Sequence, residues 1–454
     1  MTIKTFSRKL AKILALVTLP VMATQAQDKI TLDQAVARAL ENNPELAIDQ
    51  PALEAARSES EAARAGYLPR VDFEQSFLSG NNPVYVFGTL LTQRKFTASN
   101  FALPSLNSPD PLNNLQTRFT AQQIIWDAGQ TSRNLQAGRM GVEITEHAHE
   151  DHVRQTLMAT LAAYYSASLS RKVWDTSVSA LNSAQAIVDQ ARARVESGLA
   201  IEADLLRSQV YLAAARQAEI QARGRLETAR AALNRIMGAA LDAPQGETQE
   251  LIPAAFSIAS EEALLAEMKQ RRPDYQKLLV EVRQAELNVR SRHSQYLPQV
   301  GAFASWEADN PSFVESGGTN WSGGITLRWN IFAGGSDAAL LRAARQRLEQ
   351  KQRELKAMES AMALEIRKAL IQCKSAEQQV KAMEASEAQS TESLRILRNR
   401  YEAGLATITD LLAVEATASG ARSALAEALY LQRISVAQAE FAAGILGPTS
   451  AAMR

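Results

Sequence analysis

Cysteine is almost absent from this chain of 454 residues, since Cys373 is the only one. A lone cysteine cannot form an intrachain disulfide, so the fold has to be stable without one. An excess of either charge is also lacking, because 49 lysines and arginines balance 49 aspartates and glutamates. This balance excludes the strongly basic surface that is typical of nucleic-acid-binding proteins, and we predict no nucleic-acid partner.

Long hydrophobic runs and catalytic motifs are missing as well. No apolar stretch reaches the ~18 residues that a transmembrane helix requires. We find no phosphate-binding loop, no nucleophile elbow and no cluster with zinc-ligand spacing. His149 and His152 could face one ion from a helix, but a solvated helix face is the favoured interpretation. We therefore predict that the protein is not an enzyme and has neither a metal nor a cofactor.

Proline is scarce, and the positions of the 14 prolines are informative. None occurs from Leu112 to Ala243, and none from Ser312 to Gly447. Proline-free stretches of this length that are rich in alanine, leucine, glutamate, glutamine and arginine predict long helices or coiled coils.

The first 26 residues have the pattern of a secretory signal peptide. Four basic residues precede an apolar run from Ile13 to Met22, and the small residues Thr24 and Ala26 are placed as a cleavage site. We expect cleavage after Ala26 and export of the remainder.

The remainder contains an internal repeat. Three pairs of matching segments carry it: Pro44 with Pro273, Tyr67–Pro69 with Tyr296–Pro298, and Arg194–Ala200 with Arg400–Ala406. The first two pairs are offset by 229 residues and the third by 206, so the first half carries 23 extra residues. The extra residues lie between Pro69 and Trp126 and include the apolar run Val84–Leu91.

Each half predicts a helix, a pair of strands, a long helix, a turn and a returning helix. The long helices are expected at 130–197 and 336–403, and each spans roughly 100 Å at 1.5 Å per residue. The opening helix 31–66, which starts with a capping box, and the returning helix 199–237 together match one long helix. We predict a rod in which each long helix packs beside two shorter stacked helices.

Residues 320–331 alternate between apolar and polar side chains, as a membrane-spanning β-strand does. Segment 300–307 is its expected partner, and 70–79 with 117–126 form the equivalent pair of the first half. A half-buried strand pair in a soluble domain is the alternative. The aromatic residues that we expect at the bilayer interfaces are Trp126, Trp306, Trp321, Trp329 and Phe332.

Four strands cannot close a barrel, and an open sheet edge is not tolerated in lipid. Several chains must therefore contribute strands. A dimer would give eight strands and a filled interior, whereas a trimer would give twelve and leave a lumen. The helices would then lie in the periplasm, and segments 81–115 and 309–319 would be extracellular loops.

These features together resemble the TolC family of outer-membrane efflux proteins over nearly the whole mature chain. The resemblance is carried by Thr31–Ala35 with Ala39–Pro44, by the duplicated Tyr-Leu-Pro, and by two Gly-Leu-Ala segments followed by Asp204 and Asp410. It implies a mainly α fold with a small β part, assembled as a homotrimer with a 12-strand β-barrel in the outer-membrane lipid above a long periplasmic α-barrel. It further implies a periplasmic adaptor and an inner-membrane pump of RND or ABC type as partners.

The resemblance also implies roles for residues near the two helix turns. The expected adaptor-binding tips are Gly198, Leu199, Ala200, Gly404, Leu405 and Ala406. The expected pore aperture consists of Asp204, Tyr401 and Asp410. Ala406 and Ala413 stand where the family has an arginine and a second aspartate, so we expect fewer closing links. Three copies of Asp410 near one axis would favour the entry of cations over anions. The alternative role of Asp410 is helix capping.

The predicted organisation is a signal peptide 1–26, a first repeat 27–238 with β-hairpin 70–126, a periplasmic linker 239–260, a second repeat 261–447 with β-hairpin 299–332, and a tail 448–454. The predicted function is that of an outer-membrane channel in a tripartite export system, with efflux of drugs or other small molecules favoured. Type I protein secretion is an alternative use of the same duct. A periplasmic coiled-coil adaptor or scaffold is the alternative from a different class.

Overall fold

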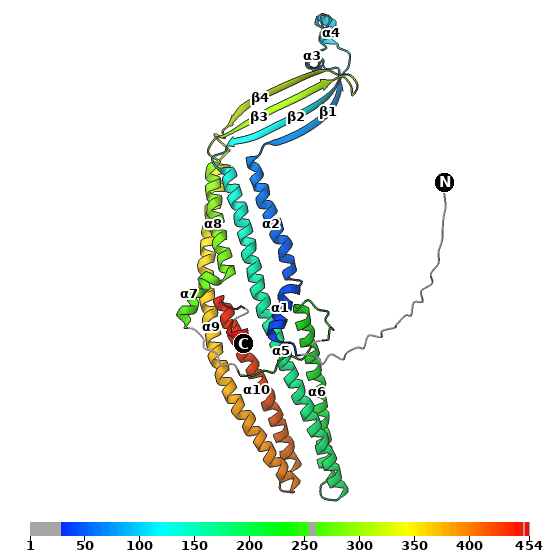
Figure 1. Cartoon of the computed structure of the whole chain (residues 1–454), viewed down its shortest axis with the longest axis vertical. Helices are drawn as coiled ribbons and strands as arrows, with labels where there is room; N and C mark the ends of the chain where they lie inside the picture. Colours follow the sequence, from blue (N-terminus) through cyan, green and yellow to red (C-terminus); the bar gives the residue numbers. More distant parts are fainter. Residues whose placement is uncertain (1–28, 245, 254–259, 448–449, 454) are drawn as a thin grey trace, which may run out of the picture.

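The protein is an elongated molecule with a β-sheet at one end and long helices over the rest of its length (Figure 1). The computed structural model describes residues 29–244, 246–253, 260–447 and 450–453, so the expected signal peptide lies outside the described residues. Within these ranges, every helix falls short of the combined length and apolarity needed to cross a bilayer. The expected fold class, mainly helical with one small sheet, is confirmed.

Both halves of the chain follow the same order of main elements. The first half contains α1 (Leu32–Asn42), α2 (Asp49–Arg64), β1 (Arg70–Gly80), β2 (Leu112–Trp126), α5 (Gln130–Glu196) and α6 (Glu202–Ile236). The second half contains α7 (Glu261–Arg271), α8 (Pro273–Ser294), β3 (Gln299–Asn310), β4 (Gly318–Arg328), α9 (Ser336–Glu402) and α10 (Ile408–Ala443). Two short helices, α3 (Pro83–Thr92) and α4 (Leu103–Asn107), lie between β1 and β2, where the sequence predicted only a loop.

The opening helix of each half is broken, which corrects the expectation of one continuous helix over 31–66. The Thr31 capping box starts α1 as expected, but Asn43 is extended at φ −64° and ψ 121° and ends it. Arg272 is likewise extended between α7 and α8. Each of these residues precedes a proline, whose ring disfavours the helical conformation of the residue before it.

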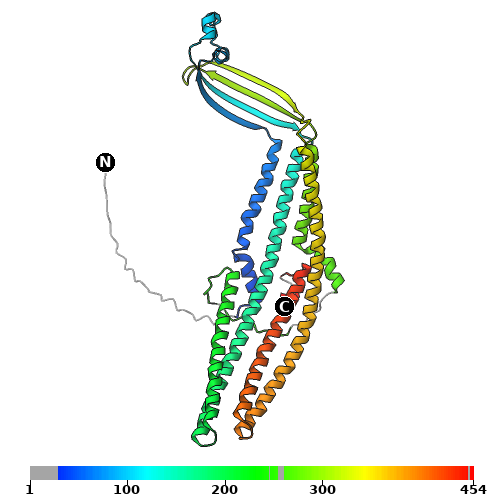
Figure 2. The same cartoon turned by 180° about the vertical axis from the view of Figure 1, so that it is seen from behind.

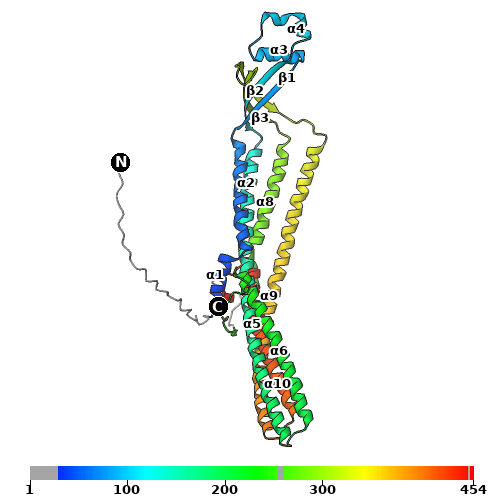
Figure 3. The same ribbon diagram turned by 90° about the vertical axis from the view of Figure 1, so that its right-hand side faces the viewer.

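Each long helix packs along two shorter stacked helices, as predicted. Helix α5 contacts α6 over one part of its length and α2 over another, and α9 contacts α10 and α8 in the same way. Figure 2 shows this layer from behind, with α5 and α10 between α6 and α9. In the side view of Figure 3, the helices continue the long axis away from the sheet.

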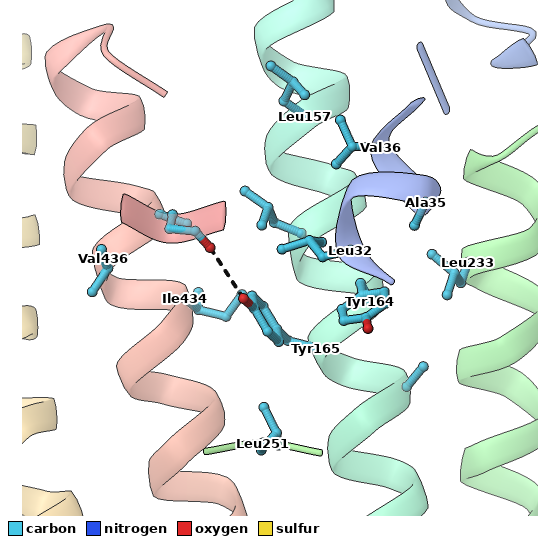
Figure 4. Close-up of a cluster of buried hydrophobic side chains, with 14 of the residues drawn as sticks. Leu32, Ala35, Val36, Leu157, Tyr164, Tyr165, Leu233, Leu251, Ile434 and Val436 are labelled. Atoms are coloured by element: carbon cyan, nitrogen blue, oxygen red, sulfur yellow. Dashed lines mark hydrogen bonds between the residues drawn. The ribbon is translucent and has the colours of Figure 1, made fainter. Parts of the chain in front are cut away.

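The largest hydrophobic core joins the two halves at the middle of the helical layer (Figure 4). Leu161 and Tyr164 of α5 are 0% and 1% exposed there, and they belong to a cluster that includes residues of α1, α6 and α10. The Tyr164 hydroxyl donates to the Ile30 carbonyl at 2.9 Å, so its polar end is satisfied inside the core. Burying one large apolar side chain stabilises the folded state by roughly 1.5–3 kcal/mol, so this cluster anchors the layer.

The sheet has the strand order β1-β2-β3-β4, and every neighbouring pair is antiparallel. The strands are longer at the outer end than predicted, since β2 starts at Leu112 and β3 continues to Asn310. Strand β4 ends at Arg328, so Trp329 and Phe332 follow the strand rather than lie in it. Strands β1 and β4 are the two edges, and neither has a second strand beside it in the described chain.

A buried arginine joins α7, α8, α9 and α10 at the break before α8. The Arg272 guanidinium lies 2.7 Å from the Asp274 carboxylate and 2.6 Å from that of Glu365, and it donates to the Ala442 carbonyl at 3.0 Å. Burial alone would raise the pKa of the Asp274 carboxyl, but hydrogen bonds and charge from Arg272 hold that pKa below its ordinary value. The ionised pair therefore stabilises the junction at neutral pH.

We expect Arg272→Met to destabilise the protein by about 3 kcal/mol at pH 7, because it removes the nearer partner of the largely buried Asp274 carboxylate and leaves it only the more distant Arg154, at 3.6 Å. The stabilisation exists above the unfolded pKa of aspartate, about 4, and is lost as the pH falls through the lowered folded pKa. The difference from wild type should therefore shrink in acid. Thermal unfolding of the purified proteins at neutral and acid pH measures this difference in stability. Arg271→Met is the control, because Arg271 is exposed and paired only within its helix. An equal loss in both variants would contradict the prediction.

Candidate functional site

The two helix turns farthest from the sheet have the same backbone structure. Gly198 and Gly404 have φ values of 72° and 76°, a left-handed conformation that glycine adopts without strain. The amide of Leu199 donates to the Arg194 carbonyl at 2.8 Å, and the amide of Leu405 donates to Arg400 at the same distance. These bonds are those of a Schellman motif, in which a left-handed residue closes the helix end.

The turns present small and apolar groups to solvent. Leu199 is 77% exposed and Leu405 is 69% exposed, so neither apolar side chain is covered by its own turn. Ala200 and Ala406 are half-buried behind them. An exposed leucine after each glycine turn is a feature that a partner protein can contact.

The two turns are tied to each other through Arg194. Its guanidinium stacks over the Tyr401 ring at 4.7 Å from the ring centre and donates to the Glu402 carbonyl at 3.0 Å. Tyr401 is only 4% exposed and belongs to an apolar cluster with Ile187 and Leu411. The predicted aperture residue Tyr401 therefore faces the neighbouring hairpin, and its contribution is to hold the two hairpins together.

The two predicted aperture aspartates lie in different surroundings. Asp410 is exposed and completes a capping box, in which its carboxylate accepts from the Thr407 amide at 3.2 Å and from the Thr407 hydroxyl at 2.6 Å. The hydroxyl bond is the main reason that the pKa of Asp410 lies below its ordinary value. Asp204 is less exposed, and Arg207 lies 3.6 Å from its carboxylate. Helix capping is thus one role of Asp410, and it leaves the charge in place.

The sheet has one mainly apolar and one mainly polar face, because successive side chains along a strand point to opposite faces. The register places Phe73, Phe119, Trp306 and Trp321 side by side, one on each strand. These aromatic side chains are 41–80% exposed in the single chain. On the opposite face, the Arg118 guanidinium pairs with the Glu307 carboxylate at 3.2 Å.

The other predicted interface aromatics lie at the end of the sheet that meets the helices. Trp126 closes β2 and is 47% exposed, while Trp329 and Phe332 are 56% and 84% exposed. The Trp329 indole donates to the Tyr296 carbonyl at 3.0 Å, which fixes the ring beside the second Tyr-Leu-Pro segment. A large apolar ring with one satisfied polar atom, such as that of Trp329, suits the boundary between lipid and water. The interface role of these aromatic residues stays a prediction.

Two histidines of α5 bind a carboxylate of α2. His149 and His152 each place Nδ1 on one oxygen of Asp49, at 3.0 Å and 2.8 Å. Burial opposes ionisation of Asp49, but the two histidine bonds keep its pKa below the ordinary value. The described residues contain no group of three or more histidine, cysteine, aspartate or glutamate side chains that is arranged to hold a metal ion.

Sequence reasoning missed Arg194 and Arg207, two arginines that reach from the first hairpin to the second near the turns. Arg207 donates weakly to the Thr409 hydroxyl at 3.5 Å. Both contacts join residues about 200 positions apart, and no local pattern encodes such a pairing. The signal that could have found them is the repeat itself, since it places the two tips side by side.

Comparison with known proteins identifies a family. The family model described as outer membrane efflux protein matches residues 35–239 and 264–444. The alkaline protease secretion protein AprF of Pseudomonas aeruginosa is 25% identical over 418 residues, which cover 90% of this chain and 83% of that protein. Protein CyaE of Bordetella pertussis is 26% identical over 211 residues, or 46% of this chain and 40% of that protein.

Solved structures show the same fold. The CmeC outer membrane channel of Campylobacter jejuni superimposes with a TM-score of 0.79 at 19% identity, covering 91% of this chain and 85% of that one. The outer membrane protein VceC of Vibrio cholerae gives a TM-score of 0.74 at 16% identity, with 91% and 96% covered.

We expect Arg194→Ala to loosen both turns without unfolding the helices. The change removes one cation–π contact and one hydrogen bond, together worth about 1–2 kcal/mol. Amide hydrogen exchange at 194–204 and 400–410 should therefore become about tenfold faster. Arg192→Ala is the control, because Arg192 is exposed on the same helix and reaches only Asp189, at 4.0 Å. Equal exchange in the two variants would show that Arg194 does not link the hairpins.

Proposed function

The chain belongs to the outer membrane efflux protein family, and on that premise we propose that three copies form a duct that exports substrates through the outer membrane. Membership places the protein in the outer membrane, among channels rather than enzymes. It also shows that the alternative of a periplasmic adaptor is wrong, since the family model covers both halves of the chain.

The observation that carries the proposal is the four-stranded sheet with two unpaired edges. Its apolar face exposes a row of four aromatic side chains, whereas its other face carries ion pairs and amides. Such a sheet suits a barrel wall with lipid outside and water inside. In hydrocarbon, the free backbone groups of β1 and β4 must find partners, and only further copies of the chain can supply them here.

Three copies account for the geometry better than two. Twelve strands enclose a lumen, while eight strands enclose little more than their own side chains. The outer helices of the layer support assembly as well, because they expose large apolar residues in the single chain. These are Leu206, Val210 and Ile220 on α6, and Leu364, Ile371 and Ile396 on α9. Since α6 and α9 form opposite edges of the layer, α6 of one copy would pack against α9 of the next.

The entrance to the duct would lie at the two turns. We propose that the exposed Leu199 and Leu405, with their glycines, contact a periplasmic adaptor that connects the duct to an inner-membrane pump of RND or ABC type. Asp410 would line the aperture, where three like charges repel anions. Asp204 would contribute less, because Arg207 neutralises part of its charge.

Small-molecule efflux and protein secretion both fit this duct. Efflux of drugs or other small molecules remains the prediction from the sequence. Protein secretion is the second candidate, and the observation that favours it is the similarity over 90% of this chain to a protein named for secretion of alkaline protease. A strain that lacks the gene distinguishes the two candidates. Loss of small-molecule efflux would raise susceptibility to toxic compounds, whereas loss of protein secretion would remove one or more secreted proteins from the medium.

The duct itself is tested by fractionation and in-cell crosslinking. We expect the protein in outer-membrane fractions as an oligomer that resists detergent extraction. A photocrosslinker at Leu199 or Leu405 should capture a periplasmic protein, and mass spectrometry would identify it. Recovery of a soluble monomer would contradict the duct, whereas a stable trimer without captured protein would contradict only the adaptor site.

We expect Asp410→Asn to lower the cation preference of single channels in planar bilayers by roughly twofold or more. The asparagine keeps a side-chain oxygen that can accept the hydrogen bonds from Thr407. The variant therefore removes the negative charge but not the capping interaction. Asp204→Asn is the matched comparison and should change selectivity less. Unchanged selectivity in the Asp410→Asn channels would remove this residue from the aperture.

We expect Gly404→Leu to abolish export while the trimer remains intact, because a bulky side chain would occupy the surface that the adaptor contacts. Gly404→Ala is the matched variant. It carries the same backbone strain, about 1 kcal/mol, but adds little bulk. Export assays together with non-denaturing gels measure both properties. Equal loss of export in the two variants, or loss of the trimer, would assign this glycine a purely structural role.

A further inference from the structure

The segment between β1 and β2 is a folded unit rather than an open loop. Its first helix, α3, starts at Asn82, whose side chain accepts from the amides of Val84 and Tyr85. The ring of Phe87 in α3 and the rings of Phe96 and Phe101 beyond it pack edge to face, with centroids 4.9–6.4 Å apart. Figure 1 shows α3 and α4 beyond the end of the sheet that lies away from the helices.

Three consecutive residues fasten this unit to the sheet: Gln93 to β2 of the first hairpin, and Arg94 and Lys95 to the second hairpin. Gln93 is 1% exposed and donates to the Asn114 side chain at 2.9 Å. Arg94 donates to the Thr319 carbonyl at 2.8 Å, and the Lys95 ammonium lies 2.9 Å from the Glu315 carboxylate. The unit therefore leaves from edge strand β1 and crosses to the start of the opposite edge strand, β4.

The side chains under the unit belong to the polar face of the sheet. Asn114 donates to Asp309 at 2.7 Å, and Asp309 is 1% exposed. The Asn320 side chain donates to the Thr92 carbonyl of the unit at 3.4 Å. The register puts Asp309 and Asn320 on the same face as Glu307, opposite the row of exposed aromatics. The unit is thus anchored on the side that would face the lumen.

The surface that the unit leaves uncovered is apolar. Val84, Leu91, Phe101 and Leu103 are 50–82% exposed. In the short loop to which the unit is fastened, Phe313 and Val314 are 82% and 95% exposed. An apolar surface of this extent at the water-filled end of a pore calls for a partner.

We propose that residues 81–111 form an outer constriction of the duct, in which the apolar surfaces of the three copies pack against one another over the extracellular mouth. This rests on the proposed function, since three copies around one axis bring the three units together. Lipid is disfavoured as the occupant, because the anchoring residues lie on the face opposite the aromatic row that lipid would contact. The surface is also continuous with the edge strands through which the copies would join.

Disulfide crosslinking tests the contact between copies. The variants L103C and V84C place thiols on the apolar surface, and the native Cys373 is 1% exposed and will not react. Oxidation of outer membranes should give covalent dimers on non-reducing gels. The control W321C, on the aromatic face, should give none. Labelling of L103C and V84C by a lipid-dissolved maleimide without dimer formation would assign the surface to lipid and overturn the proposal.

Conductance tests the constriction itself. Replacing residues 83–110 with a short glycine-serine turn should raise single-channel conductance by about twofold or more. The double variant R94A/K95A keeps the segment but removes its fastening, and it should raise the fraction of time spent in the high-conductance state. Unchanged conductance in both variants, with intact trimers, would overturn the constriction. Absence of trimers or channels in the wild-type protein would instead contradict the proposed duct.

Discussion

The structure depends on one constraint, the need of every backbone amide and carbonyl in a membrane-embedded strand for a hydrogen-bond partner. Within one chain, β2 and β3 satisfy this need on both sides, but β1 and β4 satisfy it on one side only. The single chain is therefore incomplete at its sheet, and assembly follows from backbone chemistry rather than from a particular side chain. The exposed apolar residues of α6 and α9 fit the same assembly farther from the sheet.

Much of the fold could be predicted because its signals are local. The proline-free sequence between glycine-containing segments predicted α5 and α9 to within one residue at each end. Alternation was clearest in β4, and the repeat located the equivalent strand pair of the first half. The breaks at Asn43 and Arg272 were missed although their signal was present, since each residue precedes a proline of the repeat. The prediction of one continuous helix over 31–66 gave too little weight to that rule.

The site was less predictable, because its geometry depends on contacts between distant residues. The glycine turns were found from the sequence, since left-handed backbone favours glycine. The burial of Tyr401 beneath Arg194 was not, because it arises only when the two hairpins lie side by side. The fastening of the extra segment to the second hairpin by Arg94 and Lys95 was hidden for the same reason. The repeat predicted where the insertion lies, but its conformation is set by partners more than 200 residues away.

The tight turns of the two long hairpins have a further consequence for the order of folding. Helices joined by a short turn can form their contacts in order from the turn outward, so each new contact closes a short loop and costs little loop-closure entropy. The sheet behaves differently, since its last pairings join separate molecules and must wait for an encounter. A newly exported chain can therefore complete its helical hairpins alone. Its barrel strands become fully paired in a slower step whose rate depends on concentration.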